Sequence, residues 1–76
     1  MSPSRLNKER KLVEYICEFM GARHNRRPVD SDEMINEINS FATSKYPHND
    51  EERIALNNAL IMQHNALSQA GVTFLL

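Results

Sequence analysis

The side chains best suited to chemistry are Cys17, His24, His48 and His64, and their spacing decides what they can do. A zinc site needs thiolate or imidazole ligands in closely spaced pairs such as C-x₂-C or H-x₃-H. None of these four residues belongs to such a pair, so we expect no metal and no cofactor. A nucleophilic thiol must be accessible and beside a histidine. Because Cys17 follows the apolar Ile16, we expect a buried or half-buried structural thiol instead.

The acidic and glycine residues also argue against catalysis. The run Asp50, Glu51 and Glu52 resembles the first turn of a helix, where negative charge stabilises the helix N-terminus. Gly21 and Gly71 are the only glycines, so there is no glycine-rich loop to hold a phosphate. We therefore expect that the chain is not an enzyme.

The basic residues form the remaining candidate site. They lie early in the chain, at the start of a predicted helix and in the segment "RHNRRP" that follows it. Such a surface can meet an acidic protein or the phosphates of a nucleic acid. The candidate partner-binding residues are Arg5, Lys8, Arg10, Lys11, Arg23, His24, Arg26 and Arg27.

Charge is divided along the chain although its net value is only −1. Residues 1–29 hold seven basic and three acidic residues, a balance of +4, and residues 30–76 hold two basic and seven acidic residues, a balance of −5. The two halves can pair with each other within the fold, or they can present a basic and an acidic face to two different partners. The sequence leaves both open.

These groups must be positioned by three predicted helices, at about 5–23, 31–45 and 51–70. The pattern therefore predicts an all-α, three-helix domain. We expect Ser4, Ser31 and either Asn49 or Asp50 to cap them. Each carries apolar residues at three- and four-residue spacing, which is typical of a helix with one buried face. The predicted buried stripes are Leu12, Val13, Ile16, Phe19 and Met20; Met34, Ile35, Ile38, Phe41 and Ala42; and Leu56, Ala59, Leu60, Ala66 and Leu67, widened by Ile54, Ile61 and Met62.

Proline and glycine mark the ends of these helices. Pro28 and Pro47 disfavour helix at the residues before them, and Gly71 lies where a left-handed residue commonly ends a helix. The apolar tail, 72–76, has no neighbouring strand candidate, so we expect it to pack back over the helices rather than to form a strand.

Composition indicates one small soluble domain of 76 residues, 41% of them hydrophobic. No apolar run approaches the ~20 residues that cross a bilayer, and the opening residues lack the apolar core of a secretory signal. A single cysteine fits a reducing compartment. We expect a cytoplasmic protein that does not bind membranes.

In size, in asparagine and methionine usage, in its lack of catalytic groups and in the segment "RHNRRP", the chain resembles small single-domain proteins that bacteriophages make to redirect host machines. These include RNA polymerase inhibitors, antiterminators and inhibitors of host immunity. The resemblance implies a non-catalytic viral regulator that docks on a large bacterial complex, such as RNA polymerase, and modulates or inhibits it.

Three hypotheses follow from the sequence. The first is an interaction module that clamps an acidic protein surface with Arg23, Arg26 and Arg27. The second is a small nucleic-acid-binding transcriptional regulator that uses the same segment. The acidic start of the third helix argues against that helix as a reader of DNA, since it would repel the phosphates. The third is self-association through the third helix or the tail, which is compatible with either.

Overall fold

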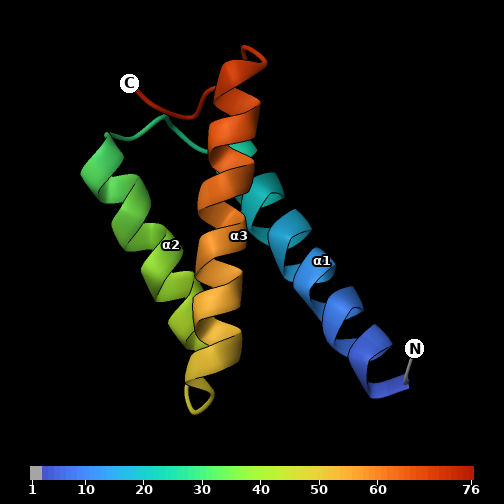
Figure 1. Cartoon of the computed structure of the whole chain (residues 1–76). Helices are drawn as coiled ribbons and strands as arrows, with labels where there is room; N and C mark the ends of the chain where they lie inside the picture. The colour runs from blue at the N-terminus through green and yellow to red at the C-terminus, as the bar shows by residue number, and fades with distance from the viewer. Residues whose placement is uncertain (1–2) are drawn as a thin grey trace.

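The computed structural model describes the backbone of residues 3–76 and the side chains of residues 6–76. It contains three helices, α1 (Pro3–His24), α2 (Ser31–Lys45) and α3 (Asp50–Gln69). α3 packs against both other helices, and α1 diverges from α2 toward its N-terminus (Figure 1). The predicted all-α, three-helix fold is confirmed. None of the helices in residues 3–76 is both long enough and apolar enough to cross a membrane.

The helix ends follow from local chemistry, with two differences from the prediction. α1 already includes Ser4 and begins at Pro3, a residue favoured at the first helical position; the Ser4 side chain lies outside the described residues. Asp30, not Ser31, caps α2. Its backbone is extended, and its carboxylate accepts a hydrogen bond from the Glu33 N–H at 2.8 Å, whereas Ser31 is already helical.

The start and end of α3 agree with the prediction. Of the two predicted alternatives, Asn49 is the cap, and its side-chain oxygen accepts a hydrogen bond from the Glu52 N–H at 3.0 Å. Gly71 has φ 91°, the left-handed conformation that ends many helices and that glycine adopts without strain.

The core lies where α3 meets α1 and α2. Its buried apolar residues come from all three helices, the linker and the tail: Phe19, Val29, Met34, Ile38, Ala42, Leu56, Leu60 and Phe74. Three helices cover only a narrow stripe of one another, so the predicted stripes are too wide. The predicted core residues that are in fact exposed are Val13, Ile35, Ile54, Met62 and Ala66.

The prediction of a buried or half-buried Cys17 is also wrong. Cys17 is exposed, because it lies two residues from Phe19 and therefore points away from the buried face of α1. His64, in contrast, is a buried polar residue. It lies four residues after Leu60 and so shares the inner face of α3, where its ring stacks on Phe74 with 6.3 Å between the centroids.

The tail docks, as expected, but with a partner that the sequence did not suggest. Val29, in the linker between α1 and α2, donates its N–H to the Phe74 carbonyl at 3.0 Å and accepts the Leu76 N–H at 3.1 Å. These bonds form a single parallel bridge. Phe74 is buried by this docking, whereas Leu76 stays 91% exposed. The tail therefore holds the linker against the end of the helices.

Candidate functional site

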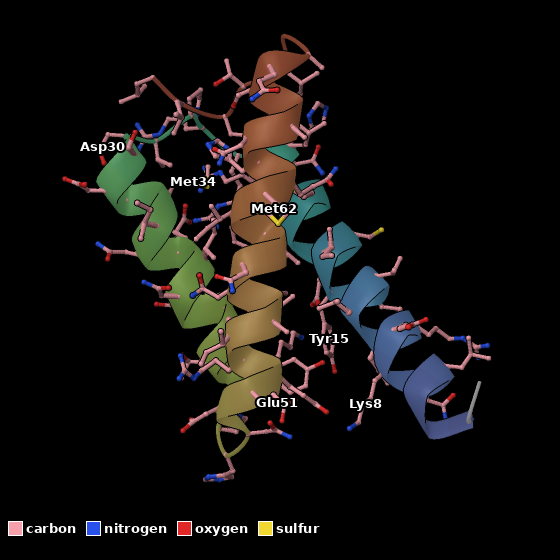
Figure 2. The ribbon with its side chains drawn as sticks, in the orientation of Figure 1. Lys8, Tyr15, Asp30, Met34, Glu51 and Met62 are labelled. Carbon is pink, nitrogen blue, oxygen red and sulfur yellow. The ribbon has the colours of Figure 1, made fainter. Side chains whose placement is uncertain are left out.

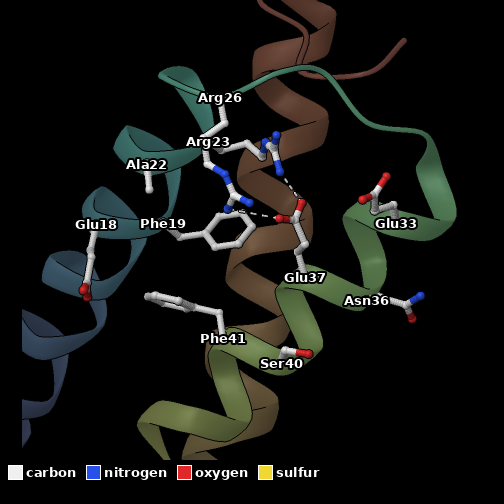
Figure 3. A pocket seen from close by; sticks show the side chains of 10 residues that line it. All are labelled: Glu18, Phe19, Ala22, Arg23, Arg26, Glu33, Asn36, Glu37, Ser40 and Phe41. Carbon is white, nitrogen blue, oxygen red and sulfur yellow. Dashed lines mark hydrogen bonds and ion pairs between the residues drawn. The ribbon is translucent and has the colours of Figure 1, made fainter.

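An open groove of about 410 Å³ lies between α1 and α2 (Figure 3). It exists because both helices pack on α3 while they diverge from each other. We call it the α1–α2 groove. Its lining residues are Glu18, Phe19, Ala22, Arg23, Arg26, Glu33, Asn36, Glu37, Ser40 and Phe41.

Two aromatic rings form the floor of the groove. Phe19 of α1 and Phe41 of α2 meet edge to face, with 5.3 Å between their centroids. At one end Lys45 extends over the Phe41 ring, 5.3 Å from its centroid, and its ammonium lies 3.0 Å from a Glu18 carboxylate oxygen. An apolar side chain entering the groove would thus meet aromatic surface inside and charged groups at the edge.

One carboxylate organises the opposite end. Glu37 accepts a hydrogen bond from the Arg23 guanidinium through one oxygen, and its other oxygen lies 3.2 Å from Arg26 Nη1 (Figure 3). Arg23 also donates to the Arg27 backbone carbonyl. The two arginines differ in surroundings, because the Arg23 side chain is 3% exposed and that of Arg26 is 63% exposed.

Helix periodicity explains this arrangement. Arg23 follows Phe19 by four residues, and Phe41 follows Glu37 by four, so each pair shares one face of its helix. α1 and α2 run in opposite directions (Figure 1), which places phenylalanine opposite phenylalanine and arginine opposite glutamate. A buried guanidinium needs a paired anion, and Glu37 supplies it.

The predicted partner-binding residues do not form one surface. Arg23 is inside the protein and serves the fold, so it is not available to clamp a partner as predicted. Arg26, at the lip of the groove, and Arg27, which follows it in the chain, stay exposed. The His24 ring lies edge-on to Phe74.

The basic residues early in α1 lie far from this lip. From residue 10 to residue 26 is ~24 Å along a helix. Lys8 lies 3.6 Å from Glu52 of α3, and Lys11 lies 3.7 Å from Glu14. Arg10 is exposed, and the Arg5 side chain lies outside the described residues.

Part of the divided charge is paired within the fold. Arg23, Arg26 and Lys8 of the basic half pair with Glu37 and Glu52 of the acidic half. Of the two alternatives that the sequence left open, self-pairing therefore accounts for part of the separation. Among the arginine side chains of residues 6–76, those of Arg10 and Arg27 make no ion pair.

Sequence reasoning missed Glu37, Phe41 and the groove itself. A usable signal was present, since "F-x-x-x-R" in α1 and "E-x-x-x-F" in α2 are complementary when two helices run antiparallel. This signal does not identify the groove by itself, because the sequence does not show which faces of the two helices meet.

No group of three His, Cys, Asp or Glu side chains in residues 6–76 is arranged to hold a metal ion. The pKa of Tyr46 is raised above its ordinary value of 10.0 by burial and then by the nearby Glu52 carboxylate, so this phenol stays protonated. No protein-family model, curated protein or solved structure matches this chain.

Proposed function

We propose that this chain is a non-catalytic binding protein that docks on a larger bacterial protein complex and modulates or inhibits it. The observation that supports this best is the α1–α2 groove, with its aromatic floor and its exposed Arg26. RNA polymerase is the first complex to test, because the resemblance noted in the sequence implies a viral regulator of that kind of machine.

The groove suits a protein segment that carries an apolar side chain next to a carboxylate. The apolar group would lie over Phe19 and Phe41, where edge-to-face aromatic contacts and removal of water both contribute. The carboxylate would meet Arg26. Aromatic and arginine side chains are the residue types that dominate the energetics of protein interfaces.

Arg26 can exchange partners at low cost. Its ion pair with Glu37 is largely exposed, and such pairs contribute only ~0–1 kcal/mol. When Arg26 turns outward, Arg23 remains to neutralise Glu37, so no buried charge is left unpaired. The neighbouring Arg27 would add long-range attraction and raise the association rate. The lip arginines therefore fit a partner with an acidic rim.

The test is binding of the purified chain to purified bacterial RNA polymerase at low and at physiological salt. We expect association that R26E/R27E weakens at least ~10-fold, about 1.4 kcal/mol, with loss concentrated in the association rate. R10E is the matched control, because it removes an unpaired arginine far from the groove, and it should bind like the wild type. Equal binding by R26E/R27E and the wild type would contradict the groove as the docking site.

Nucleic acid is the second candidate for the same lip. It predicts a complex whose affinity falls steeply with salt. R10E should also weaken this complex, about half as much in free energy as R26E/R27E, because phosphate binding depends on total positive charge and R10E reverses one charge where R26E/R27E reverses two. A gel-shift series with DNA and RNA at low ionic strength separates the two functions.

A further inference from the structure

The last third of the chain has an unusual surface chemistry. A quarter of all residues are charged, yet residues 54–76 contain no Asp, Glu, Lys or Arg. This segment includes most of α3, which packs against both other helices and has exposed residues on its remaining side. Charged side chains are the ordinary covering of a small soluble domain, so their absence here needs a physical reason.

The open side of α3 forms a ridge of amides around one methionine. Met62 is 71% exposed and projects from the face of α3 that is turned toward the viewer in Figure 2. Asn58, Asn65 and Gln69, at helical spacing around it, are also exposed. Asparagine is a poor helix former, so this composition is not explained by helix stability.

A groove without charged residues runs beside this ridge, between α2 and α3. Its volume is about 280 Å³, and its walls include Met34, Ile35 and Ile38 of α2 and Ile61, His64 and Asn65 of α3. We call it the α2–α3 groove. Ile35 is 47% exposed at its edge. Asn65 belongs to both features and follows Met62 by three residues, so ridge and groove lie side by side on one face.

We propose that this face binds a second copy of the same chain, with Met62 of each copy seated in the α2–α3 groove of the other. In a two-fold symmetric contact, the same surface of both copies forms the interface. Each residue type on that surface must therefore be compatible with itself. Amide side chains satisfy this condition because each carries both donors and acceptors. Charged side chains do not, since like charges would meet.

The chemistry of the face favours this occupant over a charged partner. A partner that recognised charge could form no ion pair with the side chains of Asp, Glu, Lys or Arg in residues 54–76, because this segment contains none. Interface centres are depleted in charged residues and enriched in methionine, and a methionine side chain adapts to an irregular apolar groove. The ridge thus supplies the inserting side chain, and the groove supplies its receptor, on one surface.

The area is sufficient for a weak dimer. The part of α3 without charged residues, 54–69, is ~24 Å long, and two neighbouring helices span roughly 20 Å. The resulting face of about 480 Å² per copy lies in the range of weak, transient interfaces. We therefore expect a dimer that dissociates in the range of tens to hundreds of micromolar, about 5–6 kcal/mol.

The test is sedimentation equilibrium of the full chain from ~10 to ~500 µM, a range that brackets micromolar association. The wild type should change from monomer to dimer across it. Met62→Lys on the ridge and Ile35→Lys at the groove should each raise the dissociation constant at least ~10-fold. Val13→Lys is the matched control, since Val13 is apolar and 58% exposed on α1, and it should leave the constant within ~2-fold of wild type.

Circular dichroism and thermal melting of the monomeric variants separate loss of the interface from loss of the fold, because both positions are exposed and lysine is a good helix former. A wild type that stays monomeric at every concentration overturns the proposal. So does a folded Met62→Lys that dimerises like the wild type, or a folded Val13→Lys that does not dimerise. R26E/R27E should dimerise normally, so failure of this proposal and failure of the partner-binding proposal are distinguishable.

Discussion

The two halves of α1 contain similar residue types and use them differently. In the C-terminal half, Phe19 and Arg23 are buried, and Arg23 is paired with Glu37 of α2. In the N-terminal half, Leu6, Arg10 and Val13 are exposed, and Lys8 makes a single ion pair to α3. An arginine in one half is therefore part of the core, whereas an arginine in the other is free for contacts. Position relative to the neighbouring helices decides the role, and charge alone does not.

The largest expected effect comes from removing the anion that pairs with Arg23. Glu37→Ala should destabilise the protein by about 3 kcal/mol, because it leaves a buried guanidinium without a full counter-charge. For a domain of this size that corresponds to a melting temperature lower by ~12–24 °C. Thermal denaturation followed by circular dichroism measures it.

Two further variants test that result. Glu33 lies on the same helix and lines the same groove but is exposed. Glu33→Ala should therefore change the free energy of unfolding by less than ~0.5 kcal/mol. The double variant Arg23→Met/Glu37→Ala removes both charges of the pair and should recover most of the lost stability. If Glu37→Ala melts like the wild type, Arg23 does not depend on Glu37.

The second effect concerns the tail that covers the C-terminal end of α1. Phe74→Ala should cost about 3 kcal/mol, in the range observed for buried phenylalanine, because Phe74 contacts both His24 and His64. Leu76→Ala is the matched control and should have no measurable effect, since that side chain is 91% exposed. Urea denaturation of the two variants compares them directly, and equal midpoints would show that the tail is not docked.

A third, smaller effect tests the difference between the halves of α1 themselves. Ile16→Ala removes a half-buried side chain packed on the core and should cost ~1–2 kcal/mol. Val13→Ala, one turn earlier, should stabilise the helix by a few tenths of a kcal/mol, because alanine has the higher helix propensity and little contact is lost. Amide hydrogen exchange should likewise be faster before residue 13 than after residue 16. Uniform protection of the amides from exchange along α1 would contradict the difference between its two halves.

The smallest effect is that of Lys8→Ala, which removes the ion pair between the N-terminal half of α1 and Glu52. The Lys8 side chain is 69% exposed, so the loss should be below ~1 kcal/mol and should vanish in high salt. Stability measured at low and at high ionic strength checks this. A loss that persists at 1 M salt would mean that Lys8 contributes by packing and not by charge.

Several features of the fold were predictable because they depend on neighbours along the chain. Pro28 and Pro47 interrupt helices by local steric clashes, and Gly71 ends α3 through its own backbone freedom. The caps of α2 and α3 were predicted to within one residue, and the error at Asp30 and Ser31 arose because both are good capping residues that stand next to each other.

Tertiary structure alone decided the candidate site and the partners of the charged groups. The sequence shows that arginines and carboxylates are separated along the chain, but pairing Arg23 with Glu37 requires α1 and α2 to run antiparallel at a particular register. The bond between Val29 and Phe74 likewise joins segments more than forty residues apart. Local propensity acts over a few residues, whereas burial depends on which faces three helices turn toward one another. The sequence by itself therefore determined the helices and the charge division, and only their packing determined which charges remain at the surface.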